Sequence, residues 1–357
     1  MQTTTTMARR TAARAIALLG ASALALAGCS LTDDLDQAPA DPTNAATPAE
    51  SAEPTATSLP DDDVPLVAVV STTPLGSVVG QIAECGGGRA ETIMGIGDDP
   101  HSFQPSSAQV AEMVNAPLIV ISGMDLEGSL ISAVESAALD GANVLAVGPL
   151  VDPLTFDETG GSHDHDGDGT PDHDDETHEH DSGYDPHWWL DASRMATAAA
   201  LIGDALAEET GGAAFAECGA QLSEELLTLD AEITEILAGV KHRELVTDHQ
   251  AFGYFATRYD FELIGAVIPS LNTDAEPSSA DLAELVHIIE EHQVAAIFAN
   301  VGASTALADA VAEEVGFDVQ IVPLYTESLG PAGSGAETYQ DMMRTNAHLI
   351  ANALSVG

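Results

Sequence analysis

Short apolar runs alternate with segments of helical periodicity from Val64 onward. Runs that are apolar throughout predict strands buried on both faces of a parallel sheet. In the first half of the chain, such runs lie at 66–70 and 117–122, and the more mixed segments 89–96 and 143–148 are also predicted to be strands. The segments between them carry apolar residues at helical spacing, which predicts helices at 74–85, 106–115 and 127–138. This alternating order predicts a parallel sheet covered by helices on both faces.

A second alternating series follows in the C-terminal half. Its predicted strands lie at 243–248, 261–268, 295–300 and 319–324, and its predicted helices at 252–259, 279–293, 305–315 and 337–354. Two helical segments, 191–209 and 213–240, separate the series, and the second would be about 40 Å long. The sequence therefore predicts an α/β fold with two lobes, each with a mainly parallel sheet flanked by helices, joined by one long connecting helix.

The N-terminal segment has the pattern of an export signal. A region with three arginines precedes an apolar stretch that is too short to span a bilayer and ends in "LAGC" at Cys29. This ending resembles the lipobox of bacterial lipoproteins, which implies that residues 1–28 are removed and Cys29 is lipidated. An ordinary cleavage site is the alternative. Residues 29–63 are rich in Pro, Ala, Thr and Asp and predict a flexible tether.

The net charge of the chain limits the kinds of partner that it can bind. The 357-residue chain has 9 basic and 58 acidic residues, a formal net charge of −49, which excludes binding to a nucleic-acid backbone and attracts cations. An exported chain folds in an oxidising compartment, where Cys85 and Cys218, the cysteines other than Cys29, can form a disulfide. Their spacing alone does not show that they meet.

A tract rich in histidine and aspartate interrupts the pattern at 160–183. Five of its histidines are candidate auxiliary metal ligands, namely His163, His165, His173, His178 and His180. Its aspartates follow the spacing of a calcium-binding loop, namely Asp164, Asp166, Asp168, Asp172 and Asp175. The tract could collect Zn²⁺ weakly or bind Ca²⁺, and a disordered acidic loop that binds neither is the other interpretation.

Four further residues stand where loops meet the carboxyl ends of predicted strands or the start of a helix. His101 and His249 each lie between a strand and a helix, His187 opens a helix after the tract, and Glu327 follows the last strand. Open α/β sheets bind ligands at such positions. Three imidazoles and one carboxylate suit tetrahedral Zn²⁺. The other histidines outside the tract are predicted to lie on the surface, namely His242, His287, His292 and His348.

The segments around these four residues resemble the ligand motifs of one family. "GDDPHSFQPS", "DPHWWLD", "DHQAFGYFATRY" and "YTESLG" contain His101, His187, His249 and Glu327 in turn. Over residues 64–357, the chain resembles the zinc- and manganese-binding lipoproteins of bacterial ABC importers, also called cluster A-I or family 9 solute-binding proteins. The boundaries expected are a first lobe at 64–212, a connecting helix at 213–241, which the resemblance implies is rigid, and a second lobe at 242–357.

The resemblance also bears on which metal is bound. Manganese-binding members usually carry Glu where His249 stands, whereas zinc-binding members carry His and often a loop rich in histidine and aspartate. Both features favour the zinc branch. The fourth carboxylate of the family is usually Asp, so the longer Glu327 leaves its denticity open, and water or a neighbouring carboxylate could complete the shell.

The function implied is that of a lipid-anchored extracytoplasmic protein that captures Zn²⁺ and delivers it to an ABC transporter permease. We expect a monomer that is not an enzyme, contacts the membrane only through its anchor, and has a metallochaperone as a possible donor. Because imidazole must be neutral to bind zinc, affinity is expected to fall below about pH 6.5. The alternatives are a manganese-binding member, a calcium-binding adhesion or matrix lipoprotein, and a zinc hydrolase, although no H-E-x-x-H or G-x-S-x-G motif is present.

Overall fold

The computed structural model describes residues 64–159 and 183–355. The predicted signal peptide, Cys29 and the tether lie outside these residues, and so do the candidate histidines and aspartates of the acidic tract. Within the part of the chain that is described, no helix combines the length and the apolar character needed to cross a membrane.

The first sheet has four parallel strands in the order β2-β1-β3-β4. These strands are β1 Leu66–Val70, β2 Arg89–Thr92, β3 Leu118–Ile121 and β4 Asn143–Ala146. The helices that follow the first three are α1 Thr73–Cys85, α2 Ser107–Asn115 and α3 Leu130–Leu139. Neighbouring residues of β1 serve two different cores, since Val69 packs with one and Val70 with the other. This two-sided burial explains why its sequence is apolar throughout.

The second sheet repeats this topology, with four parallel strands in the order β6-β5-β7-β8. Its strands are β5 Glu244–His249, β6 Glu262–Ile268, β7 Ala296–Asn300 and β8 Gln320–Leu324. Its helices are α6 Gly253–Tyr259, α7 Ser279–His292, α8 Ala306–Glu314 and α9 Tyr339–Leu354. The predicted α/β fold with two parallel sheets is thereby confirmed.

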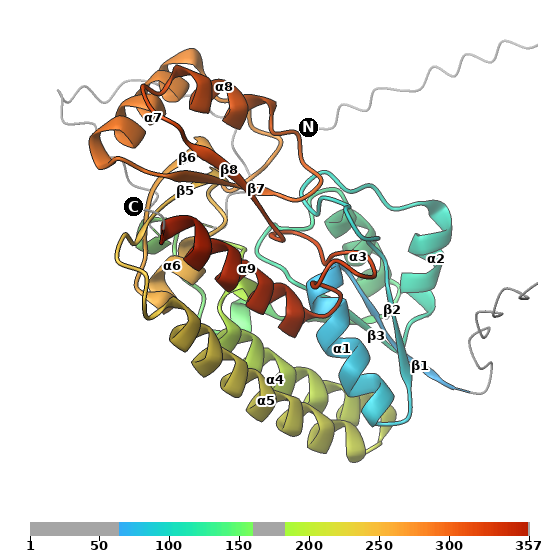
Figure 1. The fold of residues 1–357 in the computed structure, drawn as a ribbon. Coiled ribbons are helices and arrows are strands. Elements are labelled where there is room, and N and C mark those ends of the chain that lie inside the picture. The colour runs from blue at the N-terminus through green and yellow to red at the C-terminus, as the bar shows by residue number, and fades with distance from the viewer. Residues whose placement is uncertain (1–63, 160–182, 356–357) are drawn as a thin grey trace, which may run out of the picture. The chain divides into compact units, whose positions relative to one another are not determined.

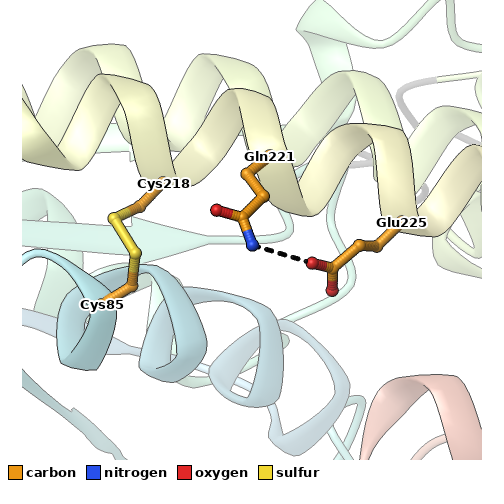
Figure 2. The surroundings of a disulfide bond; sticks show 4 residues. All are labelled: Cys85, Cys218, Gln221 and Glu225. Carbon is orange, nitrogen blue, oxygen red and sulfur yellow. Dashed lines mark hydrogen bonds between the residues drawn. A yellow bond between two sulfur atoms is a disulfide. The ribbon is translucent and has the colours of Figure 1, made fainter.

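A pair of long helices underlies both sheets. The predicted connecting helix is α5, Ala214–Leu237, and it packs along α4, Ala192–Thr210 (Figure 1). Helices α1 and α9 lie against α5. A disulfide between Cys85 and Cys218 joins α1 to α5, with a Cα–Cα distance of 6.0 Å (Figure 2).

One hydrophobic core runs through elements of both lobes. It includes Leu75 of α1, Ile202 of α4, Leu226 of α5, Phe255 of α6 and Met343 of α9. The two lobes therefore do not have wholly separate cores, because their inner helices pack in the same apolar layer. Such shared burial opposes wide separation of the lobes.

A strand and a helix of the first lobe are shorter than expected, in each case where the backbone turns. The strand expected at 89–96 ends at Thr92, ahead of Gly95 and of Gly97, whose φ is +88°. The helix expected at 127–138 begins at Leu130, after a turn in which Gly128 has a φ of +35°. Both turns lie beside the candidate site.

Helices α4 and α5 approach closely because glycine faces glycine. A Cβ on Gly219 would lie 2.6 Å from the Ala199 carbonyl oxygen and 2.8 Å from the Gly203 Cα. We therefore expect Gly219→Ala to lower the free energy of unfolding by about 1–3 kcal/mol, measured by urea denaturation. In the matched control Gly80→Ala, on α1, the new methyl meets no atom within 4 Å. That control should instead stabilise by about 0.4–1 kcal/mol. A Gly219→Ala protein as stable as the unsubstituted chain would contradict this packing.

Candidate metal centre

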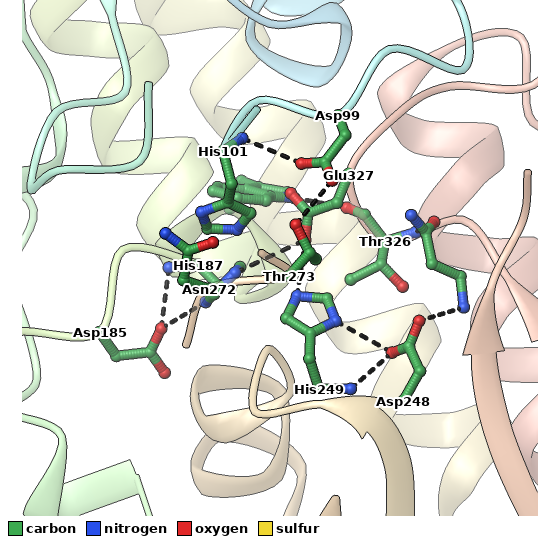
Figure 3. Close-up of polar contacts among 12 residues, drawn as sticks. Asp99, His101, Asp185, His187, Asp248, His249, Asn272, Thr273, Thr326 and Glu327 are labelled. Atoms are coloured by element: carbon green, nitrogen blue, oxygen red, sulfur yellow. Dashed lines mark hydrogen bonds and ion pairs between the residues drawn. The ribbon is translucent and has the colours of Figure 1, made fainter. Parts of the chain in front are cut away.

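The four residues singled out in the sequence meet at one point. His101 lies in the loop between β2 and α2, His187 directly precedes the 3₁₀ helix Trp188–Leu190, His249 ends β5, and Glu327 follows β8. All four are buried, and one ligand atom from each lies within 4.8 Å of the others. Figure 3 shows their side chains converging from both lobes.

Distances within the cluster leave room for one ion. The Nε2 atoms of His249 and His187 lie 3.1 Å and 3.5 Å from Glu327 Oε1. The imidazole centroids are separated by 5.2 Å (His187 to His249), 5.5 Å (His101 to His187) and 6.0 Å (His101 to His249). Within these four side chains, three buried atoms lack any hydrogen-bond partner: His101 Nε2, His187 Nε2 and Glu327 Oε2. Buried polar atoms are rarely left unpaired, and a cation at the centre would satisfy all three.

An aspartate orients the imidazole of each of two histidines. Asp185 Oδ1 lies 2.7 Å from His187 Nδ1 and also accepts from the His187 backbone N–H. Asp248 Oδ1 lies 3.0 Å from His249 Nδ1, and its Oδ2 accepts from the Asn300 backbone N–H. With Nδ1 bound to a carboxylate, each ring directs Nε2 toward the centre. Each aspartate lies one or two residues before its histidine in the sequence.

Large aromatic side chains fix the segment that carries His187. Trp188 Nε1 donates to Ser122 Oγ at 2.8 Å, and Trp189 Nε1 donates to the Thr326 carbonyl at 3.0 Å, next to Glu327. His187 was expected to open a helix, but α4 begins only after its N-cap, Asp191. The 3₁₀ turn between them places both tryptophans in the core.

A buried carboxylate holds the loop against which His101 packs. Glu127 accepts hydrogen bonds from Ser71 Oγ at 2.8 Å, Ser122 N at 2.5 Å and Gly123 N at 3.0 Å. Burial raises the pKa of the Glu127 carboxyl, and these donors oppose that rise. A Cβ on the next residue, Gly128, would lie 2.0 Å from the His101 carbonyl oxygen. Nothing in the local sequence pattern indicated this close approach.

The ionisation states in the cluster are unequal. Burial lowers the pKa of His101 to about 3, so its ring is neutral at physiological pH. Burial also disfavours charge on His249 and Glu327, but the hydrogen bonds of His249 with Asp248 and Glu327 outweigh it. They raise the pKa of His249 to about 10 and lower the pKa of Glu327 to about 2. His249 and Glu327 therefore form a buried ion pair that a metal would replace.

The remaining histidines of the described residues lie apart from this cluster. His292 Nδ1 pairs with Glu244 Oε1 at 2.9 Å, and His287 lies 4.0 Å from Glu291, both at the surface. His242 and His348 are exposed. Within the described ranges, His101, His187, His249 and Glu327 are the group of three or more potential ligands that the fold brings together.

Comparison with known proteins identifies the family of the chain. A family model described as "ZnuA: Zinc-uptake complex component A periplasmic" matches residues 68–353. The chain belongs to the ZnuA family. The match covers most of the chain, and it confirms the resemblance seen in the sequence motifs.

Relatives of this ZnuA-family chain are named for different metals. It is 28% identical over 310 residues to the manganese-binding lipoprotein MntA of Halalkalibacterium halodurans, covering 85% of this chain and 93% of MntA. It is 32% identical over 260 residues to the zinc-binding lipoprotein AdcA of Streptococcus pneumoniae, covering 72% of this chain. The chain spans 49% of the length of AdcA.

A solved structure shares the two-lobed fold. The periplasmic zinc-binding protein TroA of Treponema pallidum superposes with a TM-score of 0.68 at 26% identity, covering 82% of this chain and 99% of TroA. This likeness supports the arrangement of two four-stranded parallel sheets described above.

Proposed function

We propose that this ZnuA-family protein captures Zn²⁺ with His101, His187, His249 and Glu327 and delivers it to an ABC transporter permease. The observation that carries the proposal is the donor set: three buried imidazoles and one carboxylate within 4.8 Å of one another. Nitrogen-rich sites with four protein ligands suit Zn²⁺. Because the protein itself can fill all four positions, no open position is needed for a catalytic water, which suits transport rather than hydrolysis.

Manganese is the second candidate because MntA, which matches over 93% of its length, is named for manganese binding. Zinc binds more tightly than manganese to almost any such site, so the ratio of the two affinities discriminates poorly between a zinc-binding and a manganese-binding protein. The metal carried by protein purified without added metal is a sharper test, and we expect one zinc per chain. Manganese in place of zinc would favour the second candidate.

The surrounding segments have roles that we propose from their sequence. We place a signal peptide at 1–28, a lipid anchor at Cys29 and a tether over 29–63, and relatives of the chain are named lipoproteins. We assign the lobes to 64–212 and 242–357, on either side of a connecting segment at 213–241. The acidic tract acts as a weak collector of zinc. Any zinc bound beyond one per chain should be lost when residues 160–181 are deleted.

Substitution of Asp248 tests whether a residue that orients a ligand, without binding the metal itself, contributes to zinc affinity. In Asp248→Asn, the side chain keeps its size but loses the charge that holds the His249 ring, so we expect zinc affinity to fall by about 10–100-fold. The matched control is Asp204→Asn, an equal loss of charge at an exposed position of α4. Chelator competition measures both affinities. Equal affinities in the two variants would show that Asp248 does not support the site.

A further inference from the structure

The proposed ligands are buried, so an ion needs a route to them. A cavity of 410 Å³ lies against His249. Its wall includes Gly302, Ala303 and Ser304, which are exposed, and also His249, whose side chain is fully buried. The cavity therefore opens at the protein surface, and one of the proposed ligands stands in its wall.

Both lobes contribute to the wall of this cavity. Gly97 and Asp99 come from the loop that carries His101, whereas Asp248, Thr273 and Asn300 come from the second lobe. The two carboxylates give the wall negative charge, which favours a divalent cation over an anion. Asp99 also interacts electrostatically with Glu327 and His249, which places it next to the candidate site.

The side chain of Asp99 links the two lobes at this wall, beside a second link in which the Gly97 backbone N–H donates to Ser328 Oγ at 2.8 Å. Asp99 Oδ1 accepts a hydrogen bond from the His101 backbone N–H at 2.9 Å. Its other oxygen, Oδ2, accepts from Thr273 Oγ1 at 2.6 Å. Figure 3 shows Asp99 between the His101 backbone and Thr273. Separation of the two loops at this point requires that the Asp99–Thr273 hydrogen bond break.

Thr273 belongs to a segment that can move without unfolding a helix or strand. It lies between β6 and α7, in a turn that is closed by local hydrogen bonds. In that turn, the Asn272 N–H donates to Ser270 Oγ and the Asp274 N–H donates to Asn272 Oδ1. These local bonds can persist while the Thr273 hydroxyl leaves Asp99. The hydroxyl donor is therefore suited to making and breaking one contact between the lobes.

We propose that this cavity is the passage by which the metal reaches and leaves the site, and that the Asp99–Thr273 hydrogen bond is its gate. The proposal rests on the metal-binding function proposed above. A gate controls how fast the ion passes in both directions. It does not set the affinity, because the same barrier lies between the free and bound ion from either side.

The first test removes the gate. Thr273→Val loses the hydroxyl and keeps the shape of the side chain, so we expect both the rate of zinc capture and the rate of release to rise by about tenfold, with the dissociation constant unchanged. Stopped-flow measurements with a fluorescent chelator give both rates. Thr228→Val, on the exposed face of α5, removes a comparable hydroxyl and should leave both rates unchanged. If release alone accelerates and affinity falls by the same factor, Thr273 supports the bound form and the gate is excluded.

The second test narrows the passage. Ala303 is exposed on the cavity wall, and Ala303→Trp should slow capture and release together, again at constant affinity. Unchanged rates in this variant would show that the ion uses another route. An equilibrium titration of the unsubstituted protein comes first. Absence of a tight zinc site in that titration would overturn the proposed function, whereas a normal titration with unaltered rates in both variants overturns only the gate.

Discussion

Alanine in place of His249 is expected to weaken zinc binding by more than about a hundredfold, since loss of a direct ligand should exceed the 10–100-fold loss caused by its supporting residues. The substitution removes the Nε2 atom that lies 3.1 Å from Glu327 Oε1. It also leaves Glu327 fully buried without the partner that lowers its pKa to about 2. The affected site would hold two imidazoles and a carboxylate that is harder to ionise.

Competition against a zinc chelator measures this loss. His292→Ala is the matched control, because its imidazole also pairs with a glutamate but does so at the surface. We expect the control to bind zinc as the unsubstituted protein does. Thermal unfolding of both variants establishes that they are folded. A His249→Ala protein that keeps its affinity within about threefold would remove His249 from the site, since even a supporting residue normally contributes more than that.

Zinc affinity is also expected to fall steeply with acid, by about a hundredfold between about pH 7.5 and about pH 5.5, because zinc must displace a proton. The pair with Asp248 and Glu327 raises the pKa of His249 to about 10, so the metal-free protein carries a proton there throughout this range. For each unit by which the pH falls below that pKa, the proton competes tenfold more strongly with zinc for His249. His101, with a pKa of about 3, and Glu327, with a pKa of about 2, add no further proton to the exchange.

The ion pair changes the pH dependence expected from the sequence. Ordinary imidazole values place the loss of affinity below about pH 6.5. The buried ion pair extends this dependence to higher pH, so zinc affinity should still rise as the pH increases above neutrality. Calorimetry in buffers of different ionisation enthalpy counts the protons released, and we expect at least one per zinc near neutral pH. Zinc binding without proton release, or with equal affinity at the two pH values, would contradict the protonated state of His249.

Much of the fold was predictable because its signals are local. Most strands of the described residues contain an apolar run, such as LVAVV in β1 and LIVI in β3, and α5 follows a periodicity that is unbroken by proline. The four candidate ligands were found for the same reason. Carboxyl ends of parallel strands and the loops beside them are recognisable in sequence, and the motifs around His101 and His249 are specific.

Features that depend on contacts between distant residues were not predictable. Gly219 has no distinguishing feature in the sequence of α5, but a Cβ at this position would clash with Gly203 of α4. Glu127 reads as the start of a helix, whereas in the structure it is fully buried and organises the loop beside His101. Asp99 would pass for a surface residue before Pro100, yet it joins both lobes through Thr273. Composition and periodicity carry no information about such pairings.

The most direct test of the account is the crystal structure of the zinc-loaded protein with anomalous data collected at the zinc edge. We predict one strong anomalous peak bounded by the Nε2 atoms of His101, His187 and His249 and by a carboxylate oxygen of Glu327. The zinc–nitrogen distances should be about 2.0–2.1 Å. An anomalous peak elsewhere in the protein, with no zinc among these four side chains, would contradict the assignment of the site.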